Sequence, residues 1–364
     1  MEGQYHLNDI ISEFAITGSI ANTITIETGH INDTYRLINA DAAAPDYLLQ
    51  RINRAVFKDV PALMENIWHV TQHLKSKLPT HEAVTHAVTV VKLHDGGLYH
   101  KDHSGNYWRM LHFIKDTRSY DLVTTAQQAY QGGKAFGRFQ SMLTDLDATL
   151  LHNTIPDFHN MVHRLEQLEE AVNNNLKGKV GEVTAELEFI DQRSDRMCGI
   201  FYMGEAGHLP WRLTHNDTKF HNVLLDKTDS AQCVVDLDTV MPGYVAYDFG
   251  DSVRTIINTA AEDEADLSKI QLNIPLFEAY VKGYFQEAGH FLTDREVESL
   301  MMGVMMMPFI QAVRFLTDHL SGDIYFKVHQ AGHNLQRARA QLQLVRKLEE
   351  SEPQLQAIID AQTA

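Results

Sequence analysis

One segment in the second half of the chain gathers side chains that suit phosphoryl transfer. It runs from Asp217 through Lys219 to Asn222, and the apolar strand that follows ends at Asp236. Transfer of a phosphoryl group needs a carboxylate that orients or deprotonates the attacking hydroxyl, oxygen ligands for Mg²⁺ and a cation near the γ-phosphate. Asp217 is the candidate carboxylate and Lys219 the candidate cation. Asn222 and Asp236 are the candidate Mg²⁺ ligands.

The same segment admits two other interpretations. A His-x-Asp pair with a later Asn occurs by chance in many chains, and on its own it favours a capped turn. A zinc- or manganese-dependent hydrolase could use five side chains of this region as ligands: His215, Asp217, His221, Asp236 and Asp238. Lys219 and Asn222 weigh against the hydrolase, because phosphoryl transfer uses them and a zinc site would not need them. Phosphoryl transfer is therefore favoured. Asp238 would then either bind a second metal ion or support the ligands of the first metal ion.

The order and spacing of several motifs resemble the kinase superfamily. The run from His215 to Asn222, followed after a hairpin by Asp236, is similar to its paired catalytic and metal loops. The residues in these motifs resemble those of the aminoglycoside phosphotransferase and choline kinase branch more than those of protein kinases. They resemble those of bacterial N-acetylhexosamine 1-kinases more closely still. The segments that carry this resemblance are 29–35, 49–53, 215–219, 235–243, 247–254 and 314–320. Their order and spacing together make the resemblance specific, and it extends from about residue 20 to residue 330.

The resemblance implies a reaction and a set of binding residues. The reaction is the ATP-dependent phosphorylation of an N-acetylhexosamine (GlcNAc or GalNAc) at its anomeric hydroxyl, with Mg²⁺ as cofactor. The sugar is expected to contact His30, Asp217, Arg314 and Tyr325. The nucleotide is expected to contact Gly29, Asn32, Thr34, Arg51, Phe113 and Ile114. This fold carries a phosphate-binding lysine on its third strand, where Gln50-Arg51 stands here, so that role is either taken by Arg51 or missing.

Two acidic residues are assigned other roles. Asp248-Phe249-Gly250 spells the magnesium triplet of protein kinases, but Asp236 stands closer to Asn222 in the chain and follows directly on an apolar strand. The resemblance implies that Asp248 opens a helix and braces the catalytic loop through backbone amides. Glu65 lies nearly opposite the apolar stripe of its predicted helix, which indicates a solvated surface acid.

Composition sets the broad class of the protein. The chain has 364 residues and a formal charge of -17, which argues against nucleic acid or an anionic membrane as partner. Two cysteines, Cys198 and Cys233, exclude a disulfide framework and a four-Cys zinc site. The N-terminus shows no secretory pattern, and the longest apolar run, 300–310, is too short to span a bilayer. We therefore expect a cytoplasmic protein, with a monomer as one plausible oligomeric state.

The predicted elements form two lobes. Strands are expected at 23–27, 34–38, 47–52, 88–93 and 108–114, with a helix at 60–78 that Asp59 caps. Helices are expected at 126–143, 161–176, 276–285, 297–316 and 335–348, interrupted by a β island at 213–240. Strands followed by helices indicate an α+β protein rather than βαβ alternation. We predict a bilobal, protein-kinase-like fold with a β-rich nucleotide-binding lobe, 1–115, and a mainly helical lobe, 116–364, that carries the catalytic loop and the sugar site.

Two further functions stay open. An amino-alcohol or aminoglycoside kinase is the runner-up, although Arg314 argues against a cationic substrate. A nucleotide-binding module that has lost catalysis is favoured by the absent strand-three lysine. The complete set of Asp217, Lys219, Asn222 and Asp236 argues against that loss.

Overall fold

The first part of the chain folds into an antiparallel sheet in the computed structural model, which describes residues 5–26 and 31–363. After a short helix, α1 (Leu7–Ile11), the sheet has the order β1-β2-β3-β6-β4, and β5 pairs with the free part of β6. The strands are β1 (Ile20–Ile26), β2 (Asp33–Asn39), β3 (Tyr47–Ile52), β4 (Val90–Val91), β5 (His100–Lys101) and β6 (Tyr107–His112). The predicted strand at 88–93 is therefore much shorter than expected, because only two of its residues pair with β6.

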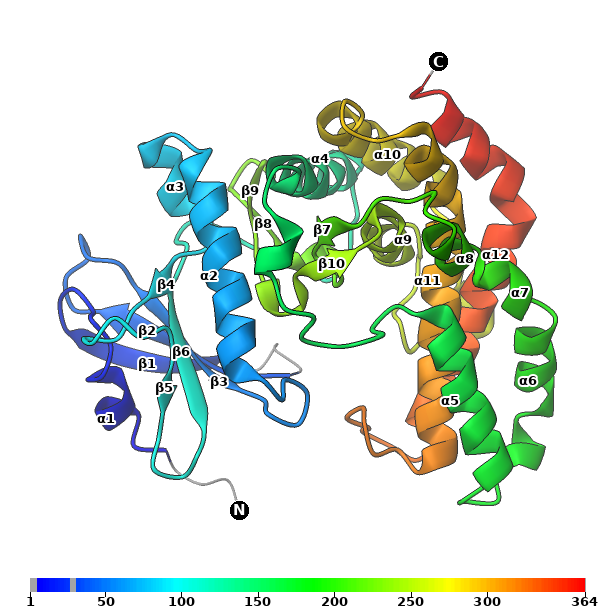
Figure 1. Ribbon diagram of the computed structural model, residues 1–364, viewed down its shortest axis with the longest axis horizontal. Helices are drawn as coiled ribbons and strands as arrows, with labels where there is room; N and C mark the ends of the chain where they lie inside the picture. The colour runs from blue at the N-terminus through cyan, green and yellow to red at the C-terminus, as the bar shows by residue number, and fades with distance from the viewer. Residues whose placement is uncertain (1–4, 27–30, 364) are drawn as a thin grey trace.

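Helix α2 (Val60–Ser76) stands between the sheet and the rest of the protein (Figure 1). Asp59 caps it as predicted, since its carboxylate accepts a hydrogen bond of 3.1 Å from the backbone N–H of Ala62. The predicted helix extends to residue 78, but α2 ends two residues earlier and is followed by α3 (Thr80–His86). One face of α2 is buried, including Leu63, Ile67 and Val70.

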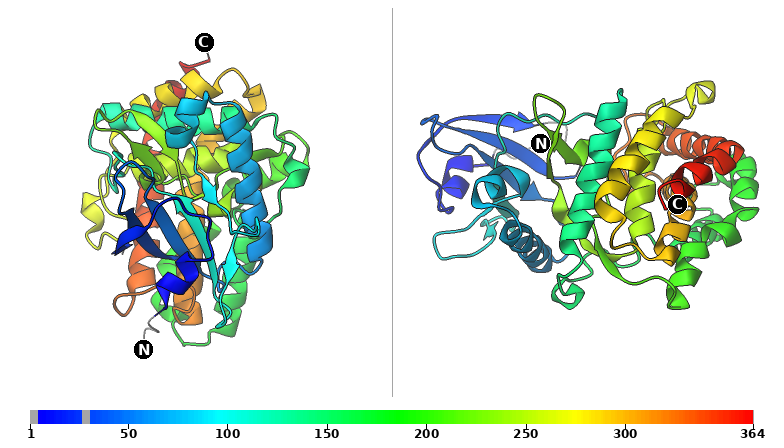
Figure 2. Two further views of the ribbon diagram at one scale, coloured as in Figure 1. Left: turned by 90° about the vertical axis from the view of Figure 1, so that its left-hand side faces the viewer. Right: turned by 90° about the horizontal axis from the view of Figure 1, so that it is seen from above.

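The remainder of the chain is mainly helical. Its helices are α4 (Ala126–Leu143), α5 (Met161–Asn174), α6 (Thr184–Asp191), α7 (Ser194–Met197), α8 (Gly199–Glu205), α9 (Val245–Ile256), α10 (Ile274–Ala288), α11 (Asp294–Ser321) and α12 (His333–Asp360). The sheet and the later helices lie at opposite ends of the molecule, with α4 between them (Figure 2, right). The predicted α+β, two-lobed arrangement is confirmed, and the predicted boundary at residue 115 falls in the segment between β6 and α4.

The predicted β island consists of two small antiparallel pairs. Strand β7 (Arg212–Thr214) pairs with β10 (Met241–Gly243), and β8 (Val223–Leu225) pairs with β9 (Ala231–Val234). The segments that carry the predicted catalytic and metal residues lie between these strands, and each ends in a short helical turn, at Phe220–Asn222 and Leu237–Thr239. Each turn is thus anchored at both ends by a strand pair, which gives the functional side chains a rigid base.

The longest helices form the core of the helical lobe. Helix α11 is long and apolar enough to cross a membrane by length and composition alone, but 78% of its most apolar window is buried inside the protein. It crosses α9 at two glycines, Gly250 and Gly303. A Cβ atom at Gly303 would overlap the carbonyl oxygen of Ala246, and one at Gly250 would overlap that of Gly303. The backbones of α9 and α11 are therefore in direct contact at this crossing.

Candidate active site

One buried carboxylate binds the backbone of residues 215–222, which we call the catalytic loop. Asp248, near the start of α9, accepts hydrogen bonds from the backbone N–H groups of His215, at 2.8 Å, and Asn216, at 2.7 Å. Gln140 of α4 donates a third hydrogen bond of 2.8 Å to the same side chain. Asn216 has a positive φ of 62°, a conformation that a non-glycine residue adopts only when its surroundings enforce it. These contacts bear out the structural role predicted for Asp248.

The catalytic loop brings three predicted residues together. The Nζ atom of Lys219 lies 3.2 Å from a carboxylate oxygen of Asp217. The side-chain amide of Asn222 donates 2.8 Å to the backbone carbonyl of Asp217 and lies 3.4 Å from its carboxylate. Burial works against ionisation of Asp217, but Lys219 and the nearby histidines outweigh it and lower the pKa of this carboxyl to about 2. Asp217 is consequently an anion at neutral pH, and the pKa of Lys219 is raised in turn by the charge of Asp217.

Asp236 begins the metal loop, which we define as residues 236–240. It has left-handed backbone angles (φ 59°, ψ 58°) and is exposed to solvent. Although water reaches the residue, the protein around it partly desolvates the carboxyl, and the charges of Asp238 and Asp217 add to this effect. Together they raise the pKa of Asp236 to about 7. A carboxyl group crowded by two others in this way gains from a bound cation.

The donor atoms of Asn222 and Asp236 fit a magnesium ion. Within residues 5–26 and 31–363, neither the Asp236 carboxylate nor the amide oxygen of Asn222 accepts a hydrogen bond, so these oxygens are available as ligands. Carboxylate and amide oxygens are the ligands that Mg²⁺ prefers. These contacts make Asn222 and Asp236 a chemically suitable pair for the metal.

Asp238 has a different environment from Asp236. It is buried, and both of its carboxylate oxygens accept hydrogen bonds from the guanidinium of Arg109, one of them at 3.0 Å. The side-chain amide of Asn32 donates a further hydrogen bond of 2.8 Å to the same carboxylate. Its oxygens are thus occupied by donors from the β-rich lobe, which disfavours the predicted direct contact of Asp238 with a metal.

Asn32 is predicted to bind the nucleotide, but both polar groups of its side chain form hydrogen bonds within the protein. Its amide reaches Asp238, and its side-chain oxygen accepts 3.0 Å from the backbone N–H of Asn53. Asn32 therefore links the turn before β2 to the metal loop. Two other predicted residues of that turn, Gly29 and His30, lie outside the described residues.

A row of polar side chains crosses the sheet on the face toward the metal loop. Thr34, Gln50 and Arg109 are register partners on β2, β3 and β6. Gln50 donates 3.1 Å to the Thr34 hydroxyl and accepts 2.9 Å from Arg109. Because Arg109 also reaches Asp238, this row connects the sheet with the metal loop.

The prediction that Arg51 could replace the strand-three lysine is wrong in this geometry. Arg51 follows Gln50 on β3, and successive side chains of a strand point to opposite faces. Its guanidinium is paired with Asp33 and lies 5.1 Å from the ring of Tyr5, on the face away from Asp238. The cation that extends toward the metal loop is Arg109 from the neighbouring strand. The sequence offered no signal for Arg109, because only the sheet register brings it beside Gln50.

The two predicted hinge residues lie just after β6. The backbone N–H of Phe113 donates 2.9 Å to the carbonyl of Asp46, and Arg36 stacks at 4.0 Å from the Phe113 ring. Ile114 is buried. A contact of these two residues with adenine stays a prediction.

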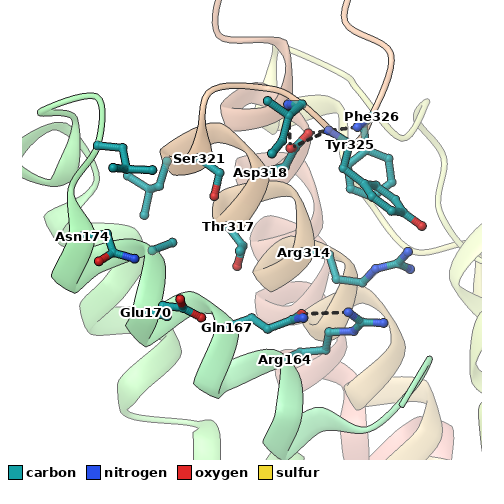
Figure 3. Close-up of a pocket in the computed structure, with 14 residues that line it drawn as sticks. Arg164, Gln167, Glu170, Asn174, Arg314, Thr317, Asp318, Ser321, Tyr325 and Phe326 are labelled. Carbon is teal, nitrogen blue, oxygen red and sulfur yellow. Dashed lines mark hydrogen bonds between the residues drawn. The ribbon is translucent and has the colours of Figure 1, made fainter. Parts of the chain in front are cut away.

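Arg314 and Tyr325 line a cavity of about 470 Å³ between α5, α11 and the loop after α11 (Figure 3). The catalytic loop does not line this cavity, but the segment Phe158–His159 joins the two. The guanidinium of Arg314 lies 5.0 Å from the Phe158 ring, and the Nε2–H of His159 donates 2.9 Å to the carbonyl of Asn216. The cavity is therefore separated from the catalytic loop by Phe158 and His159.

A metal-hydrolase site receives no support from these contacts. Both ring nitrogens of His215 are engaged, Nε2 with the carbonyl of Val235 at 2.9 Å and Nδ1 with the backbone N–H of Asp217 at 3.3 Å. Asp238 is paired with Arg109. In the part of the chain that the structure describes, no three or more His, Cys, Asp or Glu side chains are grouped to hold a metal.

Comparisons with known proteins agree with this geometry. Residues 23–291 match the model of the phosphotransferase enzyme family named for aminoglycoside phosphotransferases. This match covers well over half of the chain, which therefore belongs to that family. The fold is kinase-like, as the similar solved structures show.

One of these structures is a microcompartment-associated aminopropanol kinase, with 14% identity, coverage of 96% of this chain and 98% of the other, and a TM-score of 0.64. A choline kinase from Cryptosporidium parvum has 12% identity, coverage of 96% and 94%, and a TM-score of 0.58. An amicoumacin kinase in complex with AMP-PNP, Ca²⁺ and its ligand has 14% identity, coverage of 95% and 94%, and a TM-score of 0.59. The protein is thus a member of the phosphotransferase enzyme family, and it shares its fold with these kinases.

Proposed function

We propose that this phosphotransferase is an ATP- and Mg²⁺-dependent anomeric kinase that converts an N-acetylhexosamine into its 1-phosphate. The observation that carries the proposal is the joint placement of Asp217, Lys219 and Asn222 in one loop, with Asp236 facing them from the next. The similarity of segments 29–35 and 314–320 to N-acetylhexosamine 1-kinases supports the choice of acceptor. A cytoplasmic location and a monomeric state remain predictions.

Asp217 has the position and charge to act on the acceptor hydroxyl. Its low pKa keeps it ionised, so that it accepts a hydrogen bond from the anomeric hydroxyl and orients the oxygen for attack on the γ-phosphate. As the new bond forms, the proton of that hydroxyl passes to the carboxylate. The anomeric hydroxyl suits such a weak base because it is more acidic than an ordinary alcohol.

Lys219 and the metal pair act on the phosphates. The ammonium of Lys219 lies beside Asp217 and supplies positive charge where the transferring group gains negative charge. Mg²⁺, held by Asn222 and Asp236, would neutralise the oxygens of the triphosphate. Thr34, with Gln50 and Arg109 behind it, forms the polar sheet face above this site.

A release assay for ADP over a panel of acceptors tests the proposal. The panel contains GlcNAc, GalNAc, other free sugars, choline, aminopropanol and an aminoglycoside, each with and without Mg²⁺. We expect turnover with a free N-acetylhexosamine that requires Mg²⁺ and disappears when the anomeric hydroxyl is methylated. Equal activity on the methyl glycoside would contradict phosphorylation at that position.

An amino-alcohol or aminoglycoside kinase is the second candidate. The similar structures include kinases described as acting on aminopropanol and choline. The cavity next to the catalytic loop, however, is lined by Arg164 and Arg314, whose charges would repel a cationic acceptor. Turnover of choline or aminopropanol, but of no sugar, would favour this candidate.

A further inference from the structure

The two residues that hold the nucleotide phosphates in protein kinases are both missing from their usual positions. In those enzymes a lysine on the third strand contacts the phosphates and pairs with a glutamate on the helix beside the sheet. Here Gln50 occupies the position on β3 that faces the metal loop, because Arg51 points to the other face. Glu65 is the one acid of α2, and it pairs with His152 with its side chain about half exposed. Neither the cation nor its acidic partner is therefore supplied by β3 and α2.

A different ion pair stands between the sheet and the metal loop. Arg109 of β6 is the register partner of Gln50 and donates 2.9 Å to its side-chain oxygen. Both Nη atoms of Arg109 donate to the carboxylate of Asp238, one of them at 3.0 Å. The side chains of this pair are only 3% and 4% exposed. A bidentate pair that is shielded from water in this way fixes the plane of the guanidinium.

The hydrogen bonds of Arg109 do not use all of its donors. A guanidinium carries five N–H groups. Within residues 5–26 and 31–363, Gln50 accepts from one of them and Asp238 from two, so that two N–H groups on the Nη atoms remain for another acceptor. A buried charged donor without a partner is costly, and a phosphate oxygen is an acceptor that would complete it. Because the pair lies where the two lobes meet, a ligand that enters between the lobes reaches it without crossing either core.

The charge of Arg109 also acts on the predicted magnesium ligand. Desolvation and the charges of Asp238 and Asp217 raise the pKa of Asp236, and the positive charge of Arg109 opposes that rise. Arg109 is thus close enough to influence the carboxyl that is expected to bind Mg²⁺. In kinases this ion bridges the phosphate oxygens of the nucleotide. A cation that acts on the same carboxyl is therefore well placed to act on those phosphates.

Polar neighbours border the ion pair on the side of the sheet. Gln50 is held by the Thr34 hydroxyl, to which it donates 3.1 Å. Asn32 donates 2.8 Å to Asp238 and belongs to the turn before β2. In protein kinases a loop at the start of the sheet covers the phosphates. The pair is thus enclosed by the metal loop and by the segment that corresponds to the phosphate-covering loop.

We propose that Arg109 is the phosphate-binding cation of the nucleotide site and that Asp238 is the acid that orients it. The two would replace the strand-three lysine and the helix glutamate of protein kinases. Arg109 would contact the phosphates, whereas Asp238 and Gln50 are positioning residues that act through it. A planar guanidinium suits this role because it donates parallel hydrogen bonds to phosphate oxygens. This inference rests on the ATP-dependent part of the proposed function and is independent of the acceptor.

Binding of MgATP and of adenosine to the same variants separates a phosphate contact from a purely structural one. Arg109→Met removes the charge and retains much of the side-chain volume. We expect calorimetric titration to show MgATP binding weakened by roughly 10- to 100-fold, the range for hydrogen bonds to charged groups, with adenosine binding nearly unchanged. Arg109→Lys should retain part of the MgATP affinity, since it keeps the charge but loses the planar group. Arg51→Met is the matched control on the opposite face of the sheet, and it should leave the ratio of the two affinities unchanged.

Moving the charge back to β3 tests the relocation directly. Gln50→Lys combined with Arg109→Met places a lysine at the position used by protein kinases and should restore much of the lost MgATP affinity. Gln50→Met combined with Arg109→Met has a side chain of similar length without the charge, and it should restore none. Thermal unfolding verifies that each variant is folded. If Arg109→Met alone is unfolded because it leaves the charge of Asp238 buried, Arg109→Met combined with Asp238→Asn takes its place.

Three results would overturn the inference. One is no loss of MgATP affinity in Arg109→Met, and the second is an equal loss for MgATP and adenosine, which would make the pair structural only. The third is a lysine at position 50 that restores no more than methionine does. The proposed function can fail separately: a wild type that binds MgATP but phosphorylates no sugar contradicts the acceptor and leaves these comparisons intact. A wild type that binds no MgATP contradicts both.

Discussion

The catalytic loop and the cleft face of the sheet position charged groups around one site by different means. In the catalytic loop, Asn222 binds a residue only five positions earlier in the chain, and Asp248 of the same lobe holds the backbone. The sheet face instead reaches across to the other lobe, where Arg109 and Asn32 bind Asp238 from 129 and 206 positions away. The first arrangement is local and the second depends on how the two lobes meet.

This difference teaches where each kind of contact can fail. A loop held within one lobe keeps its geometry when the lobes move apart. The Arg109–Asp238 pair exists only when they are together, so it fastens the metal loop to the sheet. A third link has the same character, because Asn66 of α2 donates 3.2 Å to the carbonyl of Val240. The metal loop is therefore shared between the lobes, whereas the catalytic loop belongs to one of them.

The largest expected effect comes from removing the carboxylate of the catalytic loop. Asp217→Asn should lower kcat by about 10³-fold, within the range that a positioned acid or base contributes. Because the backbone is held by Asp248, the variant should keep its fold and its affinity for ATP. ADP release and nucleotide titration measure the two quantities. Near wild-type turnover would show that Asp217 is not the catalytic group.

The cross-lobe pair is tested by a double-mutant cycle of Arg109→Met and Asp238→Asn. Either single change leaves a buried charge or its partner unmatched and should cost about 3–5 kcal/mol of unfolding free energy. The double variant should cost clearly less than the sum of the two. The KM for ATP should rise in all three variants. Additive losses with an unchanged KM would show that the pair does not join the lobes at the nucleotide site.

His159, which binds the catalytic loop, should make the stability of the protein depend on pH. Burial lowers the pKa of His159 from 6.5 to about 3, and its buried Nδ1 atom has no hydrogen-bond partner among residues 5–26 and 31–363. Between these two pH values the unfolded chain binds a proton that the folded protein does not. Stability should therefore fall as the pH drops from about 6.5 toward 3, by at most about 1.4 kcal/mol for each pH unit.

Denaturant unfolding of the wild type and His159→Gln between about pH 4.5 and 7 measures this contribution. Glutamine keeps an N–H donor for the Asn216 carbonyl but does not titrate. The wild type should lose more stability than the variant as the pH decreases. Parallel curves would show that His159 is not the source of the acid sensitivity.

The smallest effect is expected at Glu65, the acid on α2 whose place in the chain could suggest a partner for a phosphate-binding cation. Its carboxylate pairs with His152 at 2.8 Å, and both side chains are about half exposed. Exposed pairs of this kind contribute roughly 0–1 kcal/mol. Glu65→Ala should leave kcat, the KM for ATP and the unfolding midpoint close to wild type. A large loss of activity would mean that Glu65 serves the site when ATP is bound.

The sequence predicted the local parts of this molecule better than the distant ones. Helix α4 has the predicted bounds. The Asp59 cap and the apolar spacing located α2 within a few residues, and the apolar spacing alone located α11 within five residues at each end. The structure also brings the predicted residues Asp217, Lys219 and Asn222 into contact, because they stand only a few positions apart in one loop. Helices α6 to α8 were missed, since they are short and have few buried residues with a helical period.

The residues that were misjudged all depend on pairing across the fold. Arg51 was considered for the strand-three role and Arg109 was not, because the sequence does not show which face of β3 a side chain occupies or which residue of β6 lies beside it. Asp238 was counted with the metal ligands because nothing in its own segment shows that Arg109 covers it. The register between strands and the contacts between lobes are set by long-range packing, which cannot be inferred from one amino-acid sequence.

The geometry of the catalytic loop also depends on the crossing of α9 and α11 at Gly250 and Gly303, although neither glycine belongs to that loop. Asp248 stands two residues before Gly250, so any group that separates the two helices also pulls on the brace of the catalytic loop. A single methyl at Gly303 would have to displace the Ala246 backbone to fit. In a scan of random variants, Gly303→Ala would therefore be scored with the inactive enzymes, although it carries no chemistry and lies in the middle of a core helix. Loss of activity at such a position would report on the spacing between the two helices.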